Sequence, residues 1–236
     1  MSDTRGIDPR AVHAIVLAGG TGERLGRRSK ADVELAGRRL LDLVLEGLAP
    51  VVDGTVVVVA PSSVRVPERV VRTLEDPPLG GPLAGIGAGL AVIAAARRAR
   101  VRDARPSTGD EGARGTSTMP DGDLVVVCSV DTPGIGVLAP RLVAALAAAA
   151  PWDGAAIVGG APEPFRQYLQ AVYRLEALSE ALERAGRLRH RGVTRALSVL
   201  DLLDVPASAD ECRDVDTPAD IAWWTARLGG SAPADG

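Results

Sequence analysis

The sequence predicts an α/β protein with a mainly parallel sheet. Two observations predict this class: short, apolar, β-branched runs alternate with segments of helical periodicity, and several runs end at loops rich in glycine or proline. No fixed-period repeat interrupts the alternation. Because ligands bind beyond the carboxyl ends of strands in such sheets, we expect functional side chains in the loops after positions 18, 60, 74 and 129.

Short apolar runs in the first 150 residues predict buried strands, and the periodic segments between them predict helices. The first run stops at Gly19-Gly20 and the second at Pro61. Leucine and isoleucine recur at helical spacing, and Pro140 falls in the first turn of the third helix. The predicted strands are 13–18, 55–60, 70–74 and 123–129, and the predicted helices are 40–48, 83–100 and 138–146.

The rest of the chain predicts further strands at 155–158, 168–174 and 201–205. Residues 175–200 predict helix, broken near Gly186 and Gly192. The last helix begins at Thr217-Pro218-Ala219-Asp220: threonine is the N-cap, proline takes the first helical position, and the aspartate completes a capping box.

A length of 236 residues suits one domain, which we place at residues 11–229. Residues 101–122 are rich in glycine, proline, serine, threonine and charge, with almost nothing to bury. We therefore expect a disordered surface insertion there, within the domain rather than between two domains. Residues 1–10 and 230–236 are expected to be flexible tails.

The composition excludes several classes of protein. A net charge of −3 argues against a general nucleic-acid binder, and no apolar run reaches the ~20 residues that span a membrane. Cys128 and Cys212 form no disulfide framework, and two histidines exclude a multi-histidine metal site. We therefore expect a cytoplasmic protein, a monomer or small homo-oligomer, with small-molecule substrates and neither a nucleic-acid nor a membrane partner.

The loop at 17–30 predicts a polyphosphate site, with a flexible strand–helix turn as the alternative. Its glycines leave backbone N–H groups free to converge on an anion, and four cations share the loop. Lys30 is the one lysine among the 27 basic residues. The loop has neither the Gly-Lys-Ser/Thr ending of a Walker A motif nor the spacing of a dinucleotide-binding GxGxxG. The glycines are Gly19, Gly20, Gly22 and Gly26, and the cations are Arg24, Arg27, Arg28 and Lys30.

Two other loops carry candidate residues. Asp131 directly follows the apolar run 123–129, where its carboxylate would face the ligand edge and suit Mg²⁺. A turn or N-cap aspartate is the alternative, but the cationic loop on a neighbouring strand favours metal binding. In the loop 74–85, Asp76 offers an acceptor and three glycines allow close backbone approach, which fits a ligand contact and an irregular turn equally well.

Together these loops resemble the molybdenum cofactor guanylyltransferase family, within the nucleotidyltransferases of GT-A-like fold. The resemblance covers nearly the whole chain in the family's order, and it implies a three-layer αβα, Rossmann-like nucleotidyltransferase fold. The segments that carry it are AIVLAGGTGERLGRRSK at 14–30, GRRLLDLVLEGL at 37–48, LEDPPLGGPLAGIGAGL at 74–90, VCSVDTPGIG at 127–136 and DVDTPADIAWW at 214–224.

The resemblance implies a Mg²⁺-dependent transfer of GMP from GTP to molybdopterin, with release of pyrophosphate and with a cofactor-delivery protein as a partner. Lys30 would contact the phosphates, and Asp131 would bind both nucleotide and Mg²⁺. Catalysis depends mainly on positioning and on cations near the charged transition state. The remaining implied residues are Arg24 for catalysis, Leu17, Ala18, Gly19, Gly20 and Asp76 for the nucleotide, and Gly81, Pro82 and Gly85 for substrate contact.

Several positions leave alternatives open. The sequence Ala18-Gly19-Gly20 favours guanine by resemblance, but Ser29 and Val59 depart from the family pattern. A transferase that uses CTP with molybdopterin, or a sugar-phosphate acceptor, therefore remains open. A non-catalytic nucleotide-binding module is the alternative from another class. Asp214 and Asp216 resemble a late polar motif near the site, and we assign neither to the metal.

Three other features have mainly structural interpretations. The basic segment at 184–191 predicts a solvated helix face and turn, rather than an anion site. Trp223 and Trp224 are expected to pack the last helix. Gln167 and Tyr168 precede a predicted strand and are candidates for substrate contact.

Overall fold

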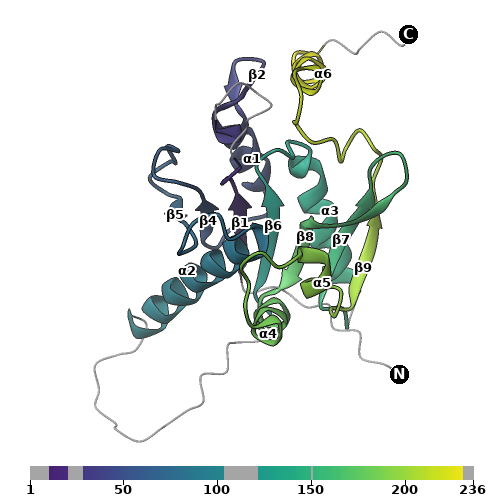
Figure 1. The fold of residues 1–236 in the computed structure, drawn as a ribbon. Coiled ribbons are helices and arrows are strands. Elements are labelled where there is room, and N and C mark those ends of the chain that lie inside the picture. Colours follow the sequence, from purple (N-terminus) through teal and green to yellow (C-terminus); the bar gives the residue numbers. More distant parts are fainter. Residues whose placement is uncertain (1–10, 21–28, 104–121, 150, 231–236) are drawn as a thin grey trace, which may run out of the picture.

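A seven-stranded sheet forms the centre of the computed structural model, which describes residues 11–20, 29–103, 122–149 and 151–230. The strands lie in the order β5-β4-β1-β6-β8-β7-β9 (Figure 1). Their bounds are β1 Val12–Leu17, β4 Val56–Val59, β5 Val71–Thr73, β6 Leu124–Ser129, β7 Gly154–Gly159, β8 Phe165–Arg174 and β9 Leu202–Pro206.

The sheet is mainly parallel, as the sequence predicts. β1 is parallel to β4 and β6, β4 to β5, and β7 to β9. Only β8 is reversed among these strands, since it is antiparallel to both β6 and β7. The carboxyl ends of β1, β4 and β6 therefore share an edge with the amino end of β8.

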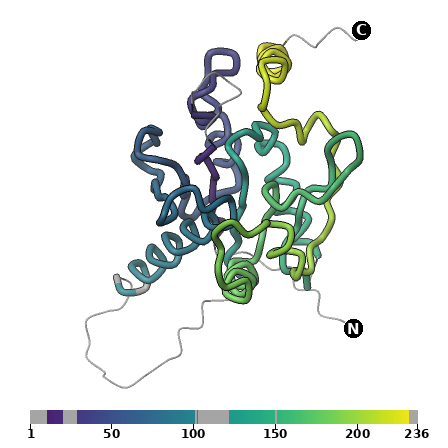
Figure 2. Tube along the Cα trace, in the orientation of Figure 1, coloured from purple at the N-terminus to yellow at the C-terminus, as the bar shows by residue number. Residues whose placement is uncertain are grey.

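Helices cover both faces of the sheet and make three layers (Figures 1 and 2). One face packs against α1 (Leu40–Leu48) and α3 (Ile135–Ala148). The other packs against α2 (Pro82–Asp103), α4 (Leu175–Ala185) and α5 (Val193–Leu197). The predicted αβα architecture is confirmed.

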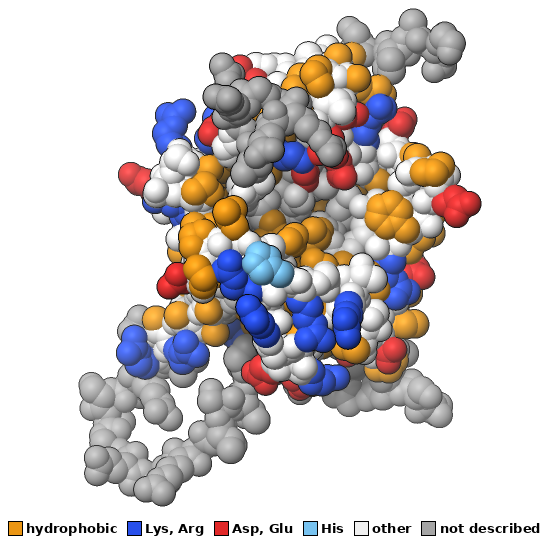
Figure 3. Space-filling model, in the orientation of Figure 1, with side chains coloured by type: hydrophobic (Ala, Val, Ile, Leu, Met, Phe, Trp, Pro, Cys, Tyr) orange, Lys and Arg blue, Asp and Glu red, His pale blue; other side chains and the backbone are white. Residues whose placement is uncertain are grey.

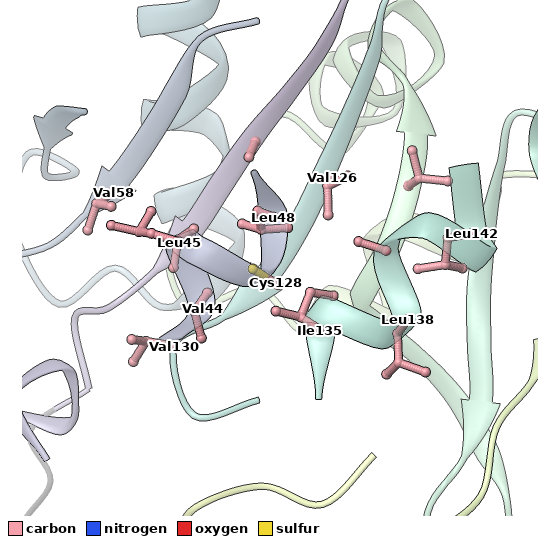
Figure 4. Packing of buried hydrophobic residues seen from close by; sticks show 14 of the residues in the cluster. Val44, Leu45, Leu48, Val58, Val126, Cys128, Val130, Ile135, Leu138 and Leu142 are labelled. Carbon is pink, nitrogen blue, oxygen red and sulfur yellow. The ribbon is translucent and has the colours of Figure 1, made fainter. Parts of the chain in front are cut away.

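The middle strands β1, β4 and β6 are apolar along almost their whole length because both faces of the sheet are buried there. In β1, Ala14 and Val16 point to the cluster under α1 and α3, whereas Ile15 points to the cluster under α2. Successive side chains on a strand alternate between faces, so each run supplies both cores. Figure 4 shows the first cluster, where residues of α1 and α3 meet Val126 and Cys128 of β6.

Two glycines set the distance between α1 and α3. A Cβ atom built on Gly47 would lie 2.7 Å from the Cα atom of Gly136. The helices approach this closely only because neither residue has a side chain at the contact. The packing supports the loop after β6 because α3 begins six residues after that strand ends.

A third, smaller cluster lies beside the edge where β1 and β6 end. The hairpin of β2 (Glu34–Leu35) and β3 (Arg38–Arg39) turns through Ala36 and Gly37, with φ of 50° and 75°. The helix α6 (Pro218–Leu228) packs Trp224 against it. The buried members of this cluster are Val33, Leu35, Leu40, Leu43, Val215 and Trp224.

Some predicted boundaries change in the structure. Residues 101–103 belong to α2, so the expected insertion at 101–122 begins too early, and residues 104–121 lie outside the described part. Helix α3 begins at Ile135, which places Pro140 inside the helix instead of in its first turn. The short β2, β3 and the 3₁₀ helix η2 (Lys30–Asp32) are not predicted, because two or three residues carry no periodicity.

The signals at helix ends are confirmed. The hydroxyl of Thr217 accepts a hydrogen bond from the backbone N–H of Asp220. The backbone N–H of Thr217 in turn donates to the carboxylate of Asp220. The predicted breaks also hold: α4 ends before Gly186, whose φ is 68°, and Gly192 is the N-cap of α5. Trp223 and Trp224 pack edge to face on α6.

One described helix, α2, is long and apolar enough over Pro82–Arg100 to cross a membrane by length and composition. No apolar stretch of this length was expected from the sequence. Within this helix Leu83, Ile86 and Ile93 are fully buried in the cluster against the sheet. The core helix of a soluble protein passes the same test, and 39% of the apolar stretch of α2 is buried inside the structure.

A buried polar pair lies at the opposite edge of the sheet, where β1 and β6 begin. His13 Nδ1 accepts a hydrogen bond from the Thr55 N–H at 2.9 Å, and its Nε2 lies 3.6 Å from Asp123 Oδ2. Burial lowers the pKa of His13 despite the opposing attraction of Asp123. The carboxylate of Asp123 also pairs with the guanidinium of Arg97 at 2.9 Å.

Candidate active site

Two cavities open at the edge where β1, β4 and β6 end. The first has a volume of about 390 Å³ and lies over the ends of β1 and β4. The second has a volume of about 340 Å³ and lies over the end of β6 and the start of β8. Ser129 and Leu169 line both cavities, so the two spaces adjoin at the end of β6. Figure 3 shows a hollow on one face of the molecule, with hydrophobic side chains at its centre and charged side chains around it.

Lys30 and Asp131 meet at this edge. Lys30 Nζ lies 2.6 Å from Asp131 Oδ2 and 2.5 Å from Asp216 Oδ1. The lysine is the first residue of η2, and its side chain passes beside Gly20, where an added Cβ would lie 3.6 Å from Lys30 Cδ. The predicted convergence of a lysine and a carboxylate is therefore present among the described residues.

The loop after β6 fixes the position of Asp131. The Val130 N–H donates to the Leu17 carbonyl at 2.9 Å, which continues the ladder between β1 and β6 by one residue. The hydroxyl of Thr132 donates to the Ser129 carbonyl at 2.7 Å and closes a tight turn. Asp131 lies between these two anchors, so its carboxylate is held at the strand end.

Asp216 reaches the same ammonium group from the segment before α6. Val215 is fully buried in the cluster around Trp224, and its N–H donates to the Asp131 carbonyl at 2.8 Å. In an extended segment, neighbouring side chains point away from the buried one. Val215 therefore acts as an anchor that turns Asp214 and Asp216 toward the site.

The electrostatics of the site follow from this crowding. Burial alone would lower the pKa of Lys30, but hydrogen bonds and charges from Asp131 and Asp216 outweigh it and raise that pKa. Lys30 is therefore a cation at neutral pH. Loss of water around the carboxyl group and repulsion by Asp131 and Asp216 raise the pKa of Asp214 to about 7, against the attraction of Lys30.

The first cavity is lined by three of the seven predicted nucleotide residues and by all three residues predicted for substrate contact. Close packing sets its shape, because an added Cβ on Gly85 would lie 3.0 Å from Leu17 Cδ2. Ala18 is buried outside the lining, and its N–H donates to the Val59 carbonyl. Asp76 is exposed outside the lining, whereas the neighbouring Glu75 lines the cavity. The predicted residues that line it are Leu17, Gly19, Gly20, Gly81, Pro82 and Gly85.

The second cavity is more polar. Asp131 and Asp214 line it, together with the first half of β8. Gln167 and Tyr168, which the sequence suggested for substrate contact, are part of this lining. Gln170 donates to Gln167 Oε1 at 2.9 Å and is almost fully buried, so this wall is held by side-chain hydrogen bonds.

The donor set suits a metal that keeps water and phosphate ligands. Within the described ranges, no group of three or more His, Cys, Asp or Glu side chains is arranged to hold a metal. Mg²⁺ commonly binds through one or two carboxylates and takes its other ligands from water and substrate phosphates. Asp131 is 17% exposed and lines the second cavity, so its carboxylate is accessible for this role.

Sequence reasoning missed part of the site. Arg24 lies outside the described residues. Asp216 was placed near the site but not at the lysine, although the Asp-Val-Asp pattern on either side of a buried valine is a usable signal. Ser129 and Leu169 carry no such signal, because a serine at a strand end and a leucine within a strand are ordinary.

Gly19, Gly20, Lys30 and Asp131 lie at the shared edge of a mainly parallel sheet, which defines an α/β protein with a candidate site beyond the carboxyl ends of its strands. The chain belongs to the family of the MobA-like NTP transferase domain, whose model matches residues 14–202. It is 35% identical over 129 residues to a molybdenum cofactor guanylyltransferase of Cereibacter sphaeroides, a match that covers 54% of each chain. The chain thus spans about half the length of the curated relatives it matches.

Solved structures share the fold. A molybdopterin-guanine dinucleotide biosynthesis protein A from Archaeoglobus fulgidus superposes with a TM-score of 0.55 at 19% identity, and the match covers 92% of this chain and 99% of that one. A 4-diphosphocytidyl-2C-methyl-D-erythritol synthase from Anaerococcus prevotii superposes with a TM-score of 0.64 at 13% identity, over 96% and 100%. At these identities the likeness concerns the fold, and the GT-A-like prediction is confirmed.

Proposed function

We propose that the protein is a Mg²⁺-dependent nucleotidyltransferase that transfers GMP from GTP to molybdopterin and releases pyrophosphate. The observation that carries the proposal is the position of Lys30 and Asp131, which touch each other beside two adjoining cavities. One cavity suits a nucleotide and the other an acceptor. The family match supports the reaction class.

The first cavity is the proposed nucleotide site. Its apolar lining of Leu17, Val59 and Leu79 suits the flat faces of a base, and Gly19 and Gly20 lead toward Lys30. The triphosphate would lie along these glycines, with the ammonium of Lys30 at its charged end. A preorganised cation at this place stabilises the charge that develops on the phosphates.

Asp131 is the proposed metal ligand. When bound, Mg²⁺ would neutralise phosphate charge and align the reacting groups. Lys30 and Asp131 pair with each other in the structure. On binding, Lys30 exchanges carboxylate partners for phosphate oxygens, which leaves the Asp131 carboxylate free for the cation.

The second cavity is the proposed acceptor site. A terminal phosphate of the acceptor would attack the α-phosphorus of the nucleotide; a new oxygen–phosphorus bond forms, and the bond to the β-phosphate breaks. Arg166 lines this cavity with its guanidinium paired to Asp204 at 2.6 Å, and its other N–H groups would contact an anionic acceptor. The protein contributes mainly position and charge, which is what phosphoryl-type transfer requires.

Two alternatives belong to the same enzyme class. They are transfer from CTP to molybdopterin and transfer to a sugar-phosphate acceptor, and one structural neighbour is a 4-diphosphocytidyl-2C-methyl-D-erythritol synthase. A third hypothesis, from a different class, is a non-catalytic nucleotide-binding module. The contact between Lys30 and Asp131 favours an enzyme, because binding alone does not require a carboxylate at the phosphate-binding lysine.

The deciding experiment is a pyrophosphate-release assay on the purified full chain with Mg²⁺. GTP and CTP are each tested alone, with molybdopterin and with a sugar phosphate, and Lys30→Ala is the control. Release that needs both GTP and molybdopterin supports the proposal. Release with CTP or with a sugar phosphate selects an alternative, and tight nucleotide binding without release indicates the non-catalytic module.

We further propose that residues 11–229 act as one domain, in the cytoplasm, as a monomer or small homo-oligomer that receives its acceptor from a cofactor-delivery protein. Cys128 and Cys212 are both free and buried, which fits a reducing compartment. Analytical ultracentrifugation measures the oligomeric state. Co-purification with a molybdopterin-carrying protein tests the partner.

A further inference from the structure

The loop between β5 and α2 forms one side of the first cavity, and within the loop the Gly80 N–H donates to Glu75 Oε1 at 3.1 Å. Glu75, Leu79 and Gly81 line the cavity. Leu79 is 72% exposed with a φ of 63°, and Gly81 has a φ of 90°, so the backbone lies in the left-handed region at both positions. Pro77 and Pro78 have no N–H groups. The loop therefore needs support from another part of the chain.

That support comes from the segment between α4 and α5, more than 100 positions away. Arg189 Nη1 donates to the Pro77 carbonyl at 3.0 Å and Nη2 to the Pro78 carbonyl at 3.4 Å. The His190 N–H donates to the Gly80 carbonyl at 2.7 Å. The carbonyl groups of three loop residues thus accept hydrogen bonds from two neighbouring residues, Arg189 and His190.

The supporting segment is itself fixed to the core. Leu188 packs against α2, where an added Cβ on Gly87 would lie 2.6 Å from Leu188 Cδ1. Arg191 Nη1 donates to the Ala185 carbonyl at 2.5 Å, at the end of α4. The expectation of a solvated basic turn is therefore wrong for Arg189 and Arg191, whose guanidinium groups bond backbone carbonyls.

The chemistry of these contacts needs arginine. A guanidinium presents several N–H donors in a planar fork, so one side chain reaches the carbonyls of two consecutive residues. Its stem also passes close to the loop, since an added Cβ on Gly80 would lie 2.9 Å from Arg189 Cγ. A lysine offers a single ammonium point and cannot reproduce the paired bonds.

We propose that Arg189 is a positioning residue for the nucleotide site: it acts through the loop 75–81 and sets the shape of the first cavity before a ligand enters. This inference rests on the proposed function, in which that cavity takes the nucleoside triphosphate. Loss of the guanidinium frees the loop, so nucleotide binding must reorder it first. The cost falls on the KM for nucleotide, and the step after binding is preserved because Lys30 and Asp131 are held by other elements.

The test compares Arg189→Ala, Arg189→Lys and the matched control Arg187→Ala, which removes an exposed arginine from the same segment. With GTP varied and acceptor saturating, Arg189→Ala should raise the nucleotide KM about tenfold, equivalent to about 1.4 kcal/mol, with kcat changed less than twofold. Arg189→Lys should restore little, and Arg187→Ala should match the wild type. An unchanged KM, or a fall in kcat with KM constant, overturns the inference.

A second measurement does not depend on turnover. Amide hydrogen exchange of the peptide 75–83 in the ligand-free protein should quicken about tenfold in Arg189→Ala and stay unchanged in Arg187→Ala. Unchanged exchange in Arg189→Ala overturns the inference even if the enzyme is active. If the wild type turns over no nucleotide, the proposed function fails, and the exchange experiment still decides whether Arg189 orders the loop.

Discussion

Lys30 Nζ lies 2.6 Å from Asp131 Oδ2, although 101 positions separate the two residues in the chain. The contact joins the loop after β1 to the loop after β6, and these strands are adjacent in the sheet. Replacing Lys30 by alanine removes the cation proposed to face the phosphates. We expect a loss of about 100-fold or more in kcat/KM, measured by pyrophosphate release.

Lys30→Arg should remain deficient, because a guanidinium is larger and presents its charge in a plane instead of at a point. Circular dichroism and thermal unfolding should show that both variants stay folded. Wild-type turnover in Lys30→Ala would show that Lys30 forms only a structural ion pair and has no role in catalysis.

Asp131→Asn keeps the size of the side chain and removes its charge. We expect transfer to fall at least about 100-fold, because a neutral amide is a poor Mg²⁺ ligand. The matched control is Asp201→Asn, since Asp201 is exposed at the start of β9, on the opposite edge of the sheet. Activity of Asp131→Asn equal to that of Asp201→Asn would contradict the metal assignment.

Gly47→Ala tests the contact between α1 and α3. The new methyl group would lie 2.7 Å from the Cα atom of Gly136, and a helix backbone cannot yield as a flexible side chain can. We expect a loss of about 2 kcal/mol in the free energy of unfolding, measured in urea. Gly192→Ala is the control: its φ is −65° and nothing lies within 4 Å of the added atom, so stability should change little.

His13 predicts a pH dependence of stability. Its folded pKa is lowered by burial, so the unfolded chain binds a proton more readily. Stability from this group is present above the ordinary histidine pKa of about 6.5 and is lost as the pH falls below it, by at most about 1.4 kcal/mol per pH unit. Protonation at Nδ1 would also break the hydrogen bond that this nitrogen accepts from the Thr55 N–H.

The measurement is urea unfolding at pH 7.5 and pH 5.5 for the wild type and His13→Asn. Asparagine offers an acceptor to Thr55 and does not titrate. The wild type should lose more stability between the two pH values than the variant. Equal losses would show that His13 does not contribute to acid sensitivity.

The middle strands of the sheet were predictable from sequence because they are buried on both faces and form nearly continuous apolar runs, such as Val56–Val59. The cap of α6 was predictable because its signals are local to Thr217–Asp220. The direction of β8 was not, since a strand that runs against its neighbours has the same composition as one that runs with them.

The candidate site was predictable to the extent that its residues follow strand ends. Asp131 follows the end of β6 directly, and Lys30 lies at the far end of the loop that follows β1. Asp216 comes from a segment 85 positions beyond Asp131 and is placed by the burial of Val215. The sequence predicted a solvated side chain for Arg189, because its partners are backbone carbonyls and no sequence pattern indicates such contacts. Contacts to backbone atoms leave the partner residue type unconstrained, and they are therefore invisible to motif reasoning.

Because β8 is reversed, the two cavities at this edge of the sheet are lined by different parts of the chain. The cavity proposed for the nucleotide is assembled mostly from β1, β4 and the loop before α2, in the first 90 positions of the chain. Residues Phe165–Gln170 of the reversed strand line the other cavity. A chimera that exchanges only the β7–β8 hairpin between relatives should therefore change which acceptor molecule is used. The choice of nucleotide base should stay that of the protein that receives the hairpin.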